Sequence, residues 1–322
     1  MTEIVLTGGS GFLGSRVREE LERRGKNPHV FVSPRSAEIP EGIVADITDP
    51  KSLEAVMPPV QCVIHCAGLA HQFGETPEAT FAAVNQLGTT NVIAAAAKAG
   101  ARRFVLVSSV SVYGSGNNAN EDSPCAPQTP YARSKRNAEQ AARQIASDTG
   151  MSLVILRLAT LYGPDDPGNI RRLIDAITSG RFVWLGDGSN RKSLLYVTDA
   201  ARACVDAATL GGPSDIYNVV DETVTVREIV EEIGRSVKRR LPRYHVPAAA
   251  VRFAARVACS LPIARARQAG ETAAKWLRDD VYDGSKFSRA YRFEPRVSLQ
   301  EGIAAATKSN LESGGHATTL LD

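Results

Sequence analysis

Residues 3–14 run Glu-Ile-Val-Leu-Thr-Gly-Gly-Ser-Gly-Phe-Leu-Gly, and this stretch decides the fold. Its first apolar residues predict a buried strand, and the run that follows it predicts a helix that stops at Gly25. A strand, a glycine-rich turn and a helix in this order begin the nucleotide-binding half of a doubly wound sheet. The N-terminal segment therefore predicts an α/β fold.

Three glycines in this turn have the spacing of a phosphate cradle. Gly8 permits the tight turn, Gly11 lets the backbone approach a pyrophosphate, and Gly14 allows the helix to pack closely on the strand. The gap between the first two glycines is one residue longer than in the usual fingerprint, but the same physical reasoning applies. Because the helix N-terminus then faces the phosphates, we expect a dinucleotide here, with Phe12 and Leu13 beside it.

The end of the second predicted strand, His29–Val32, bears on which dinucleotide is bound. An acidic residue there would bind the ribose 2′-hydroxyl of NAD, and the segment that follows the strand begins Ser-Pro-Arg-Ser instead. Ser33 and Arg35 suit a 2′-phosphate, which favours NADP slightly and leaves NAD open. The alternative interpretation is a surface loop with an incidental arginine.

Strands and helices alternate over the first half of the chain. Further strands are predicted at 43–47, 61–66, 103–107 and 151–157. This alternation predicts a parallel, doubly wound Rossmann sheet. Beyond residue 162 the pattern changes to short strands, loops rich in glycine and aspartate, and helices, which predicts a smaller mixed α/β lobe that supplies cations for an anionic substrate.

The predicted domain boundaries follow from this change of pattern. We expect the NAD(P)-binding Rossmann domain at 1–163 and about 191–220, the substrate-binding lobe at about 164–190 and 221–308, and a mobile polar tail at 309–322.

Other candidate site residues lie where predicted strands end, because ligands of open parallel sheets bind beyond the carboxyl ends of the strands. Asp46 follows a short strand and is placed to meet an adenine, and Ala67-Gly68-Leu69 lets the backbone pass close to a cofactor. Ser108-Ser109 ends the next strand. Asn85 lies in a predicted Ala-rich helix, 77–99, where a buried amide needs partners such as the backbone of a neighbouring strand.

The segment Tyr131-Ala-Arg-Ser-Lys135 opens a predicted helix behind Pro130. Residues four apart lie on one helix face, so Lys135 is expected beside Tyr131. A neighbouring ammonium favours the phenolate, which would lower the pKa of the tyrosine from about 10 and make a general acid/base. Taken alone the motif is weak, because most such pairs are an aromatic anchor next to a solvated charge.

The composition narrows the possible functions. The 322 residues are 43% hydrophobic and 23% charged with a net charge of +3, which is ordinary for a globular protein. Basic residues are spread out apart from short groups such as Lys238-Arg-Arg240, for which a solvated face is the preferred interpretation, so no nucleic-acid partner is expected. Five cysteines without Cys-x-x-Cys and five scattered histidines predict neither a disulfide framework nor a metal site. With no visible signal peptide, a reduced, cytoplasmic protein is expected.

The longest apolar run, residues 246–261, bears on membrane attachment. It contains Arg252 and Arg256 and is too short to span a bilayer comfortably, so no transmembrane segment is expected. A packed helix is the preferred interpretation, and attachment to a membrane surface stays open.

Seven motifs in order resemble the extended short-chain dehydrogenase/reductases of the NAD-dependent epimerase/dehydratase type, and most of all the nucleotide-sugar epimerases and ketoreductases. The resemblance extends to about residue 305. The motifs are Thr7-Gly-Gly-Ser-Gly-Phe-Leu-Gly14, Asp46-Ile47, His65-Cys-Ala-Gly-Leu69, Asn85, Ser108-Ser-Val-Ser-Val-Tyr-Gly114, Pro127-Gln-Thr-Pro-Tyr131-Ala-Arg-Ser-Lys135, and Leu156-Arg157 with Tyr162-Gly-Pro164.

The resemblance implies roles for individual residues. Ser109, Tyr131 and Lys135 would form the catalytic triad, and Lys135 would also bind the nicotinamide ribose. Asp46 and Ile47 would meet the adenine. The implied cofactor contacts further include Ala67, Gly68, Leu69, Asn85 and Ser108, and the implied substrate contacts are Ser111, Thr160, Asn169, Arg191 and Lys192.

Departures from the family pattern narrow the chemistry. Val110-Ser111 stands where the dehydratases carry an Asp-Glu pair, and neither residue can exchange a proton as a carboxylic acid would, so dehydration is disfavoured. Ser111 also replaces the cysteine of the GDP-fucose synthase type, which disfavours combined 3,5-epimerisation. Thr160 replaces a common asparagine, and the phosphate-binding cation could be Arg191 or Lys192. The sequence around these cations resembles that of relatives that act on N-acetylated or 6-deoxy sugars in surface-polysaccharide synthesis.

The expected function is hydride transfer at C4 of a nucleotide-activated hexose, by a 4-epimerase or a 4-ketoreductase. An NADP-dependent reductase of a non-sugar carbonyl and a non-catalytic NADP-binding sensor are the alternatives. Cations at 191–192 argue against the first alternative, and the intact triad argues against the second. The resemblance also implies a homodimer, paired through the helices around 77–99 and 131–147.

Overall fold

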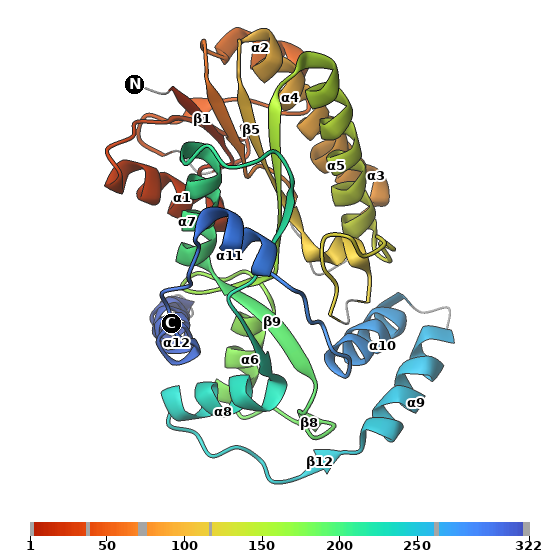
Figure 1. Cartoon of the computed structure of the whole chain (residues 1–322). Helices are drawn as coiled ribbons and strands as arrows, with labels where there is room; N and C mark the ends of the chain where they lie inside the picture. Colours follow the sequence, from red (N-terminus) through yellow and green to blue (C-terminus); the bar gives the residue numbers. More distant parts are fainter. Residues whose placement is uncertain (1–2, 37–38, 70–75, 116–117, 261–263, 318–322) are drawn as a thin grey trace. The chain divides into compact units, whose positions relative to one another are not determined.

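The computed structural model describes residues 3–36, 39–69, 76–115, 118–260 and 264–317 (Figure 1). The chain divides into two compact units. The first unit comprises residues 1–159, 197–221 and 282–295, and the second comprises residues 160–196, 222–281 and 296–322.

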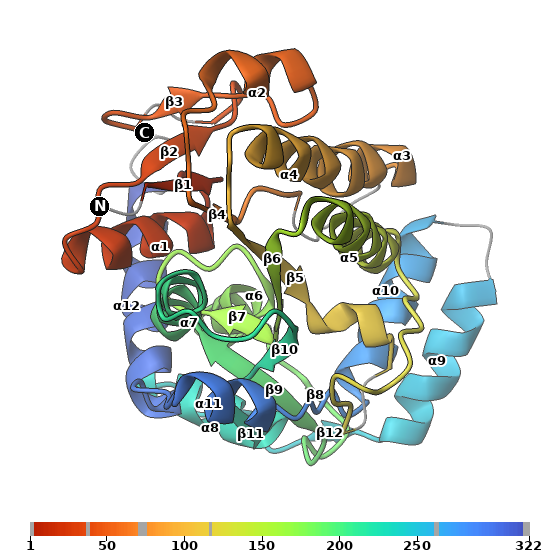
Figure 2. The same cartoon turned by 45° about the horizontal axis from the view of Figure 1, so that its top comes forward.

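The first unit is a doubly wound α/β sheet, which confirms the predicted fold class. Its seven strands are all parallel, in the order β10-β6-β5-β4-β1-β2-β3. Helices α2, α4 and α5 cover one face of the sheet, and α1 and α7 cover the other (Figure 2). The strands are β1 (Ile4–Thr7), β2 (His29–Val32), β3 (Ile43–Val44), β4 (Cys62–His65), β5 (Arg103–Ser109), β6 (Ser152–Leu158) and β10 (Ile216–Val219).

The helices of this unit begin and end where local chemistry dictates. Asp49 caps α2 and Thr129 caps α5, and both helices have proline in the first turn, where a missing N–H costs nothing. Gly150 ends α5 in the left-handed conformation. The helices are α1 (Phe12–Arg23), α2 (Pro50–Val56), α3 (Glu78–Phe81), α4 (Gly88–Lys98), α5 (Pro130–Thr149), α7 (Val197–Thr209) and α11 (Ser285–Tyr291).

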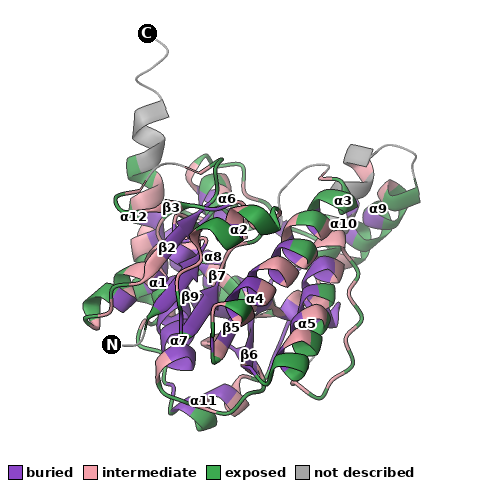
Figure 3. Cartoon of the chain, turned by 90° about the horizontal axis from the view of Figure 1, so that it is seen from above, coloured by how far each residue is buried: buried purple, intermediate pink, exposed green. Residues whose placement is uncertain are grey.

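The core of the sheet is buried on both faces, as strands flanked by helices require. Val5, Val63 and Phe104 have no exposed surface, and Figure 3 shows the buried residues following the strands. On the α2/α4/α5 face, Leu53, Val92 and further small and branched residues fill the space between helices and sheet. This packing fixes the carboxyl ends of β1, β4 and β5, where most of the predicted site residues of this unit lie.

A third segment, residues 282–295, completes the first unit although the expected domain ended near residue 220. It carries α11, whose Phe287 and Tyr291 pack edge-on against Tyr217 of β10. These aromatic side chains are buried, and aromatic contacts of this kind stabilise by more than their area alone. Distant burial of this sort has no local sequence signal.

The second unit is smaller and mixed, as predicted. Strand β9 (Arg191–Tyr196) lies between parallel β7 (Thr160–Tyr162) and antiparallel β11 (Glu222–Thr225), and β8 (Trp184–Leu185) pairs with β12 (His245–Val246). Isoleucines of α6 and α8 fill its core, and a capping box at Thr225 begins α8. The helices are α6 (Asn169–Thr178), α8 (Val226–Ser236), α9 (Ala248–Ser260), α10 (Ala264–Trp276) and α12 (Leu299–Ala317).

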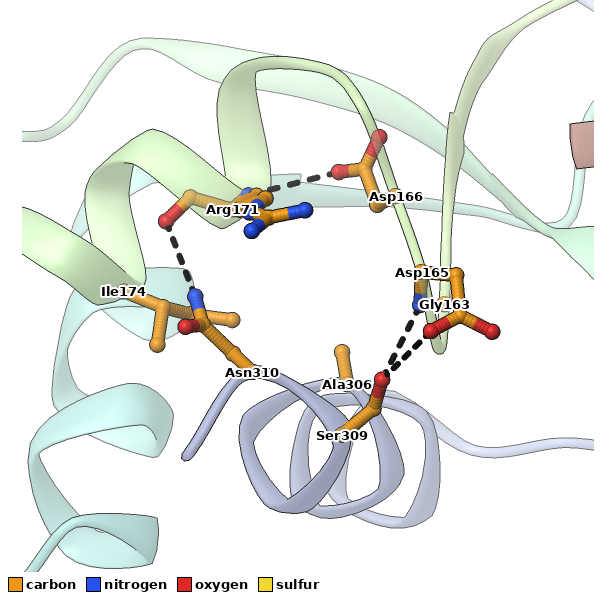
Figure 4. Close-up of a pocket in the computed structure, with 8 residues that line it drawn as sticks. All are labelled: Gly163, Asp165, Asp166, Arg171, Ile174, Ala306, Ser309 and Asn310. Atoms are coloured by element: carbon orange, nitrogen blue, oxygen red, sulfur yellow. Dashed lines mark hydrogen bonds between the residues drawn. The ribbon is translucent and has the colours of Figure 1, made fainter. Parts of the chain in front are cut away.

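Helix α12 continues past Lys308, where a polar tail was expected to begin. Its polar residues are tied to the rest of the second unit: Ser309 Oγ donates to Asp165 Oδ1 at 2.9 Å, and Asn310 Nδ2 donates to Asp175 Oδ1 at 2.9 Å. Figure 4 shows the small pocket that Ser309 and Asn310 line together with Asp165 and Arg171. The pocket contains none of the predicted site residues.

Candidate active site

The glycine turn of the first unit has the geometry of a phosphate cradle. Gly8 has a φ of +74°, and a Cβ on it would lie 2.7 Å from the backbone of Ala67, so only glycine fits the turn. A Cβ on Gly14 would lie 2.0 Å from the Gly8 carbonyl oxygen. At Gly11 a Cβ would meet only that oxygen, at 3.3 Å. Gly11 caps α1 without a side-chain hydrogen bond, so its helix N-terminus suits a pyrophosphate, and the residues present fit a dinucleotide.

Two substitutions separate the packing role of this turn from its binding role. We expect Gly14→Ala to lower both the affinity for NAD(H) or NADP(H), by at least about tenfold, and the stability, by about 1–3 kcal/mol, because the turn must move. Gly11→Ala should lower the affinity with a much smaller loss of stability, since its Cβ requires the Gly8 carbonyl to shift by only a few tenths of an ångström. Nucleotide titration and urea unfolding of both variants measure the two effects. Equal losses of stability in both variants would contradict this account.

The end of β2 and the loop after β3 bring Arg35 close to Asp46. Two hydrogen bonds from Thr48 to the Asp46 carboxylate, at 2.9 and 2.7 Å, lower its pKa, and the charge of Arg35 adds to this shift. Ser33 Oγ accepts from the Arg35 backbone N–H at 3.2 Å, and both residues are exposed. The Ile47 carbonyl accepts from Asn91 at 3.0 Å, which fixes the loop beside α4.

The helix predicted at 77–99 contains a turn of π-helix, Ala82–Leu87, between α3 and α4, and Asn85 lies within it. The buried Asn85 amide accepts from the Leu69 N–H at 2.7 Å and donates to the Leu69 carbonyl at 3.0 Å. It also donates to Ser134 Oγ of α5 at 2.9 Å. The expected role in holding backbone is thus observed, on the loop after β4. Gly68 packs tightly on the same amide, because a Cβ there would lie 3.0 Å from Asn85 Oδ1.

The three predicted catalytic residues come together at the end of β5 and the start of α5. Ser109 is hydrogen-bonded to the Tyr131 side chain, and its Oγ accepts from the Ser111 N–H at 3.2 Å. Lys135 lies one turn after Tyr131 and is buried, with 8% of its surface exposed. Its Nζ donates to the Val107 carbonyl at 2.6 Å. The backbone near the end of strand β5 therefore holds the lysine next to the Ser109–Tyr131 pair.

The pKa of Tyr131 differs from the sequence expectation. Burial raises it above its usual value of about 10, and the Ser109 hydrogen bond opposes this shift. Burial lowers the pKa of Lys135 to about 8, against the opposing charge of Glu139. The pKa of Tyr131 in the protein alone is therefore raised by burial, whereas the sequence predicted a lowered pKa.

This lysine should make stability depend on pH in a defined window. Because its pKa is about 8 in the folded protein and about 10.4 when unfolded, the unfolded chain binds more protons between these values, and stability rises with pH there. Between pH 7.5 and 10.5 we expect the unfolding free energy of wild type to rise, relative to that of Lys135→Met, by up to about 3 kcal/mol. Urea titrations of both proteins across this range measure it. A difference that is constant with pH would refute the shift.

A buried histidine behind the turn was not assigned a role from the sequence. His65 Nδ1 lies 2.7 Å from Thr7 Oγ1, and its Nε2 lies 3.0 Å from Thr89 Oγ1. Burial and the charge of Lys135 lower its pKa to about 3, so it stays neutral. Thr7 Oγ1 also accepts from the Ala67 N–H at 3.2 Å. This network aligns the loops after β1 and β4 on which Gly8 and Ala67 lie.

A buried ion pair lies one turn beyond Lys135 and was also missed. Arg157 of β6 donates to both carboxylate oxygens of Glu139, at 3.0 and 2.7 Å, and their side chains are 1% and 0% exposed. Ser108, a predicted cofactor contact, donates to the same carboxylate at 2.6 Å. The available signal was the spacing of Tyr131, Lys135 and Glu139, which places all three on one helix face.

Ser111 of the first unit lies two residues beyond Ser109, on a single 3-10 turn, Val110–Tyr113. Its hydroxyl is buried, and no described group makes a hydrogen bond to it. Buried hydroxyls are normally paired, so an orphan beside the Ser109–Tyr131 pair fits a polar ligand atom.

The remaining predicted substrate contacts lie in the second unit. Thr160 begins β7 and is exposed, and Asn169 begins α6. Lys192 is nearly enclosed: its Nζ pairs with Asp280 at 2.7 Å and donates to the carbonyls of Lys275 and Arg278. Arg191 is half-exposed and makes a longer contact, 3.3 Å, with Asp279. Within the described ranges, no cluster of three or more His, Cys, Asp or Glu could hold a metal ion.

Comparisons with known proteins agree with this geometry. The model of the NAD dependent epimerase/dehydratase family matches residues 4–219. A protein of Escherichia coli O157:H7 named N-acetyl-alpha-D-glucosaminyl-diphospho-ditrans,octacis-undecaprenol 4-epimerase is 30% identical over 251 residues, 76% of this chain and 75% of the relative. UDP-glucose 4-epimerase of Vibrio cholerae is 27% identical over 260 residues, 76% and 78% of the two chains. The structure of MoeE5 in complex with UDP-glucuronic acid and NAD superposes with a TM-score of 0.78 at 26% identity, covering 97% of this chain and 99% of that one.

Proposed function

The chain belongs to the NAD dependent epimerase/dehydratase family, and from this premise we propose that it transfers a hydride at C4 of a nucleotide-activated hexose. It is an NAD(P)-dependent enzyme that acts as a 4-epimerase or a 4-ketoreductase. The observation that carries the proposal is the Ser109–Tyr131 hydrogen bond, with the Lys135 ammonium held one turn away and the orphan Ser111 hydroxyl beside it.

The proton chemistry follows from these positions. Tyr131 takes the proton of the sugar 4-hydroxyl as the alcohol becomes a ketone, and returns it in the reverse direction. Ser109 donates a hydrogen bond to the same oxygen and stabilises the charge that develops on it. The raised pKa of Tyr131 suits proton donation to a ketone, and proton removal requires a cation close to the phenol. Lys135 is the nearest candidate, because it follows Tyr131 by one turn.

The residues that would hold the cofactor lie around the carboxyl ends of the strands β1 to β5. Gly8, Gly11 and the N-terminus of α1 would bind its pyrophosphate, Asp46 and Ile47 its adenine, and Lys135 its nicotinamide ribose. When bound, the nicotinamide accepts and returns the hydride. The exposed Ser33 and Arg35 favour a 2′-phosphate and thus NADP, whereas MoeE5 was solved with NAD.

Two features bear on the substrate. Val110 and Ser111 provide no carboxylic acid beside Ser109, which disfavours dehydration. Of the two cations at 191–192, Arg191 is the better ligand for a diphosphate, because Lys192 is already committed to Asp280 and two carbonyls. The E. coli relative is named for a sugar on a polyprenyl diphosphate, so the carrier in this substrate is either a nucleotide or a polyprenol.

We also propose a cytoplasmic homodimer. All five cysteines are free, which fits a reducing compartment. Leu87, 49% exposed in the π-helical turn, and the Ala-rich α4 beside α5 offer an apolar surface for pairing. Size-exclusion chromatography with light scattering on wild type and Leu87→Glu tests this, and a monomeric wild type would exclude it.

The function is tested by incubating the purified protein anaerobically with UDP-, dTDP- and GDP-hexoses and a polyprenyl-diphosphate hexose. NAD and NADP are added separately, products are followed by NMR, and reduced nicotinamide is followed by absorbance. A C4 epimer without net absorbance change identifies the epimerase. Oxidation of NADPH by a 4-keto sugar identifies the ketoreductase. If the protein turns over none of these sugars but reduces a non-sugar ketone, the sugar assignment is overturned.

A further inference from the structure

Helix α9 of the second unit packs with only one of its faces. Val251 and Ala255, one turn apart, are buried, and α10 crosses them closely: a Cβ on Gly270 would lie 2.7 Å from the Ala255 carbonyl oxygen and 3.1 Å from Ala258. The two helices form a hairpin, visible in Figure 1. The expectation of a packed helix in this apolar run therefore holds for one side of it.

The opposite side of α9 exposes large apolar groups. Phe253 is 70% exposed and Val257 is 44% exposed, and they lie one turn apart beside the exposed Ala250 and Ala254. Exposed phenylalanine at this level is unusual in the described part of the chain, where most phenylalanines are buried in the core. The outer face of α9 is therefore an apolar stripe, and Figure 3 shows exposed residues along this helix.

The segment that leads into α9 adds two more exposed apolar side chains. Tyr244 is 89% exposed and Val246 is 37% exposed, and Pro247 joins them directly to the helix. Large exposed hydrophobic residues elsewhere in the described chain are scattered singly, so their concentration within 244–257 marks one surface. We call the exposed residues of segment 238–260 the α9 surface.

Positive charge surrounds this apolar stripe. Segment 238–260 contains no Asp or Glu, and its cations are all exposed: Lys238, Arg239, Arg240, Arg243, Arg252 and Arg256. Arg252 and Arg256 lie on one flank of the α9 stripe, one turn apart. Lys238, Arg239 and Arg240 line a shallow hollow with Arg235 at the end of α8. Glu231 also lines that hollow, among the four cations. The surface thus combines an aromatic and aliphatic face with a predominantly positive field.

We propose that the α9 surface binds the anionic phospholipid surface of a membrane. A helix with Phe and Val on one side and arginines on its flank matches an interfacial helix, which lies in the headgroup region with its apolar face down. Basic side chains beside it are attracted to anionic lipids. Within the described residues no helix is long and apolar enough to cross a bilayer, so the contact is peripheral. A second copy fits poorly, because two such surfaces would place like charges face to face.

The test is vesicle flotation of the full-length protein. We expect binding to phosphatidylcholine vesicles containing about 30% phosphatidylglycerol at 0.1 M salt, and little binding to pure phosphatidylcholine or at 0.5 M salt, where surface charges are screened. Arg252→Glu with Arg256→Glu should weaken binding at least about twentyfold, because each removed charge near the surface costs about fivefold. Phe253→Ser should weaken it about tenfold.

The matched control reverses two exposed cations of the first unit, Lys51→Glu with Arg102→Glu, and should bind as wild type does. Circular dichroism and thermal unfolding of each variant show whether it folds. Binding that is equal for neutral and anionic vesicles, absent for wild type, or equally reduced in the control overturns the proposal. A change of oligomeric state in Phe253→Ser would assign the stripe to self-association instead and would also overturn it. None of these outcomes depends on the proposed activity.

Discussion

Replacing Tyr131 by phenylalanine is expected to lower kcat about a thousandfold and to leave the fold intact. The change removes one oxygen, which is hydrogen-bonded to Ser109 at the end of β5. The ring keeps its edge-on contact with Phe81, whose centroid lies 6.1 Å away. A positioned acid/base contributes about 10²–10⁴-fold to such proton transfers. Steady-state kinetics on the substrate identified by the panel measures the loss.

A matched control is Tyr291→Phe, which removes another buried phenolic oxygen. The Tyr291 hydroxyl, on α11, accepts a hydrogen bond from Arg103 at 3.0 Å. It is not among the proposed catalytic groups. Its kcat should stay within about twofold of wild type. Nucleotide titration of Tyr131→Phe should give wild-type affinity, since the glycine turn is untouched. If Tyr131→Phe keeps the wild-type kcat, Tyr131 is not the acid/base, whatever kcat the Tyr291→Phe control shows.

Replacing Glu139 by leucine should cost about 3–5 kcal/mol of unfolding free energy. The substitution leaves the Arg157 guanidinium buried without its carboxylate, since the two side chains are 1% and 0% exposed. It also removes the acceptor of Ser108. Breaking a buried pair in this way costs more than the pair contributes, because an uncompensated charge stays in a medium that solvates it poorly. Urea unfolding monitored by circular dichroism measures the effect.

Two further variants test that cause. The double variant Glu139→Leu with Arg157→Leu should recover much of the loss, because no buried charge is left unpaired. Arg136, which also contacts Glu139 at 3.0 Å, has a side chain that is 25% exposed and can be solvated by water. Glu78→Leu breaks a two-contact pair with Arg133 of similar length, at 2.7 and 2.8 Å, but on the surface, and should cost only a small fraction of the buried loss. If the buried and the exposed substitutions cost the same, burial is not the source of the effect.

What the sequence predicted well was local. The glycine turn, the parallel strands and the Tyr131–Lys135 helix each depend on neighbouring residues, whose spacing is visible in the chain. The π-helical turn that carries Asn85 was not predicted, because its extra residue is fixed by contacts with Leu69 and Ser134. The direction of the Tyr131 pKa shift was not predicted for a related reason: burial of the phenol raises the pKa, and only the fold produces that burial.

The features that the sequence did not predict at all are contacts between residues far apart in the chain. Arg157 was noticed only as part of a motif, and its carboxylate partner lies on another element. Segment 282–295 joins the first unit through the aromatic contacts of Tyr217 with Phe287 and Tyr291. A buried contact of this kind has no periodicity along the chain, so pattern analysis cannot find it.

The interrupted path of the chain through the first unit has a consequence for how the protein is made. Strand β6 ends at Leu158, but its neighbour β10, at the edge of the sheet, begins only at Ile216. At ribosomal speeds of about 5–20 residues per second, this apolar strand waits on the order of several seconds with one edge unpaired. Such an edge is a template for pairing with other chains. The nascent chain is therefore most vulnerable to aggregation in this interval, when a chaperone would have the most to protect.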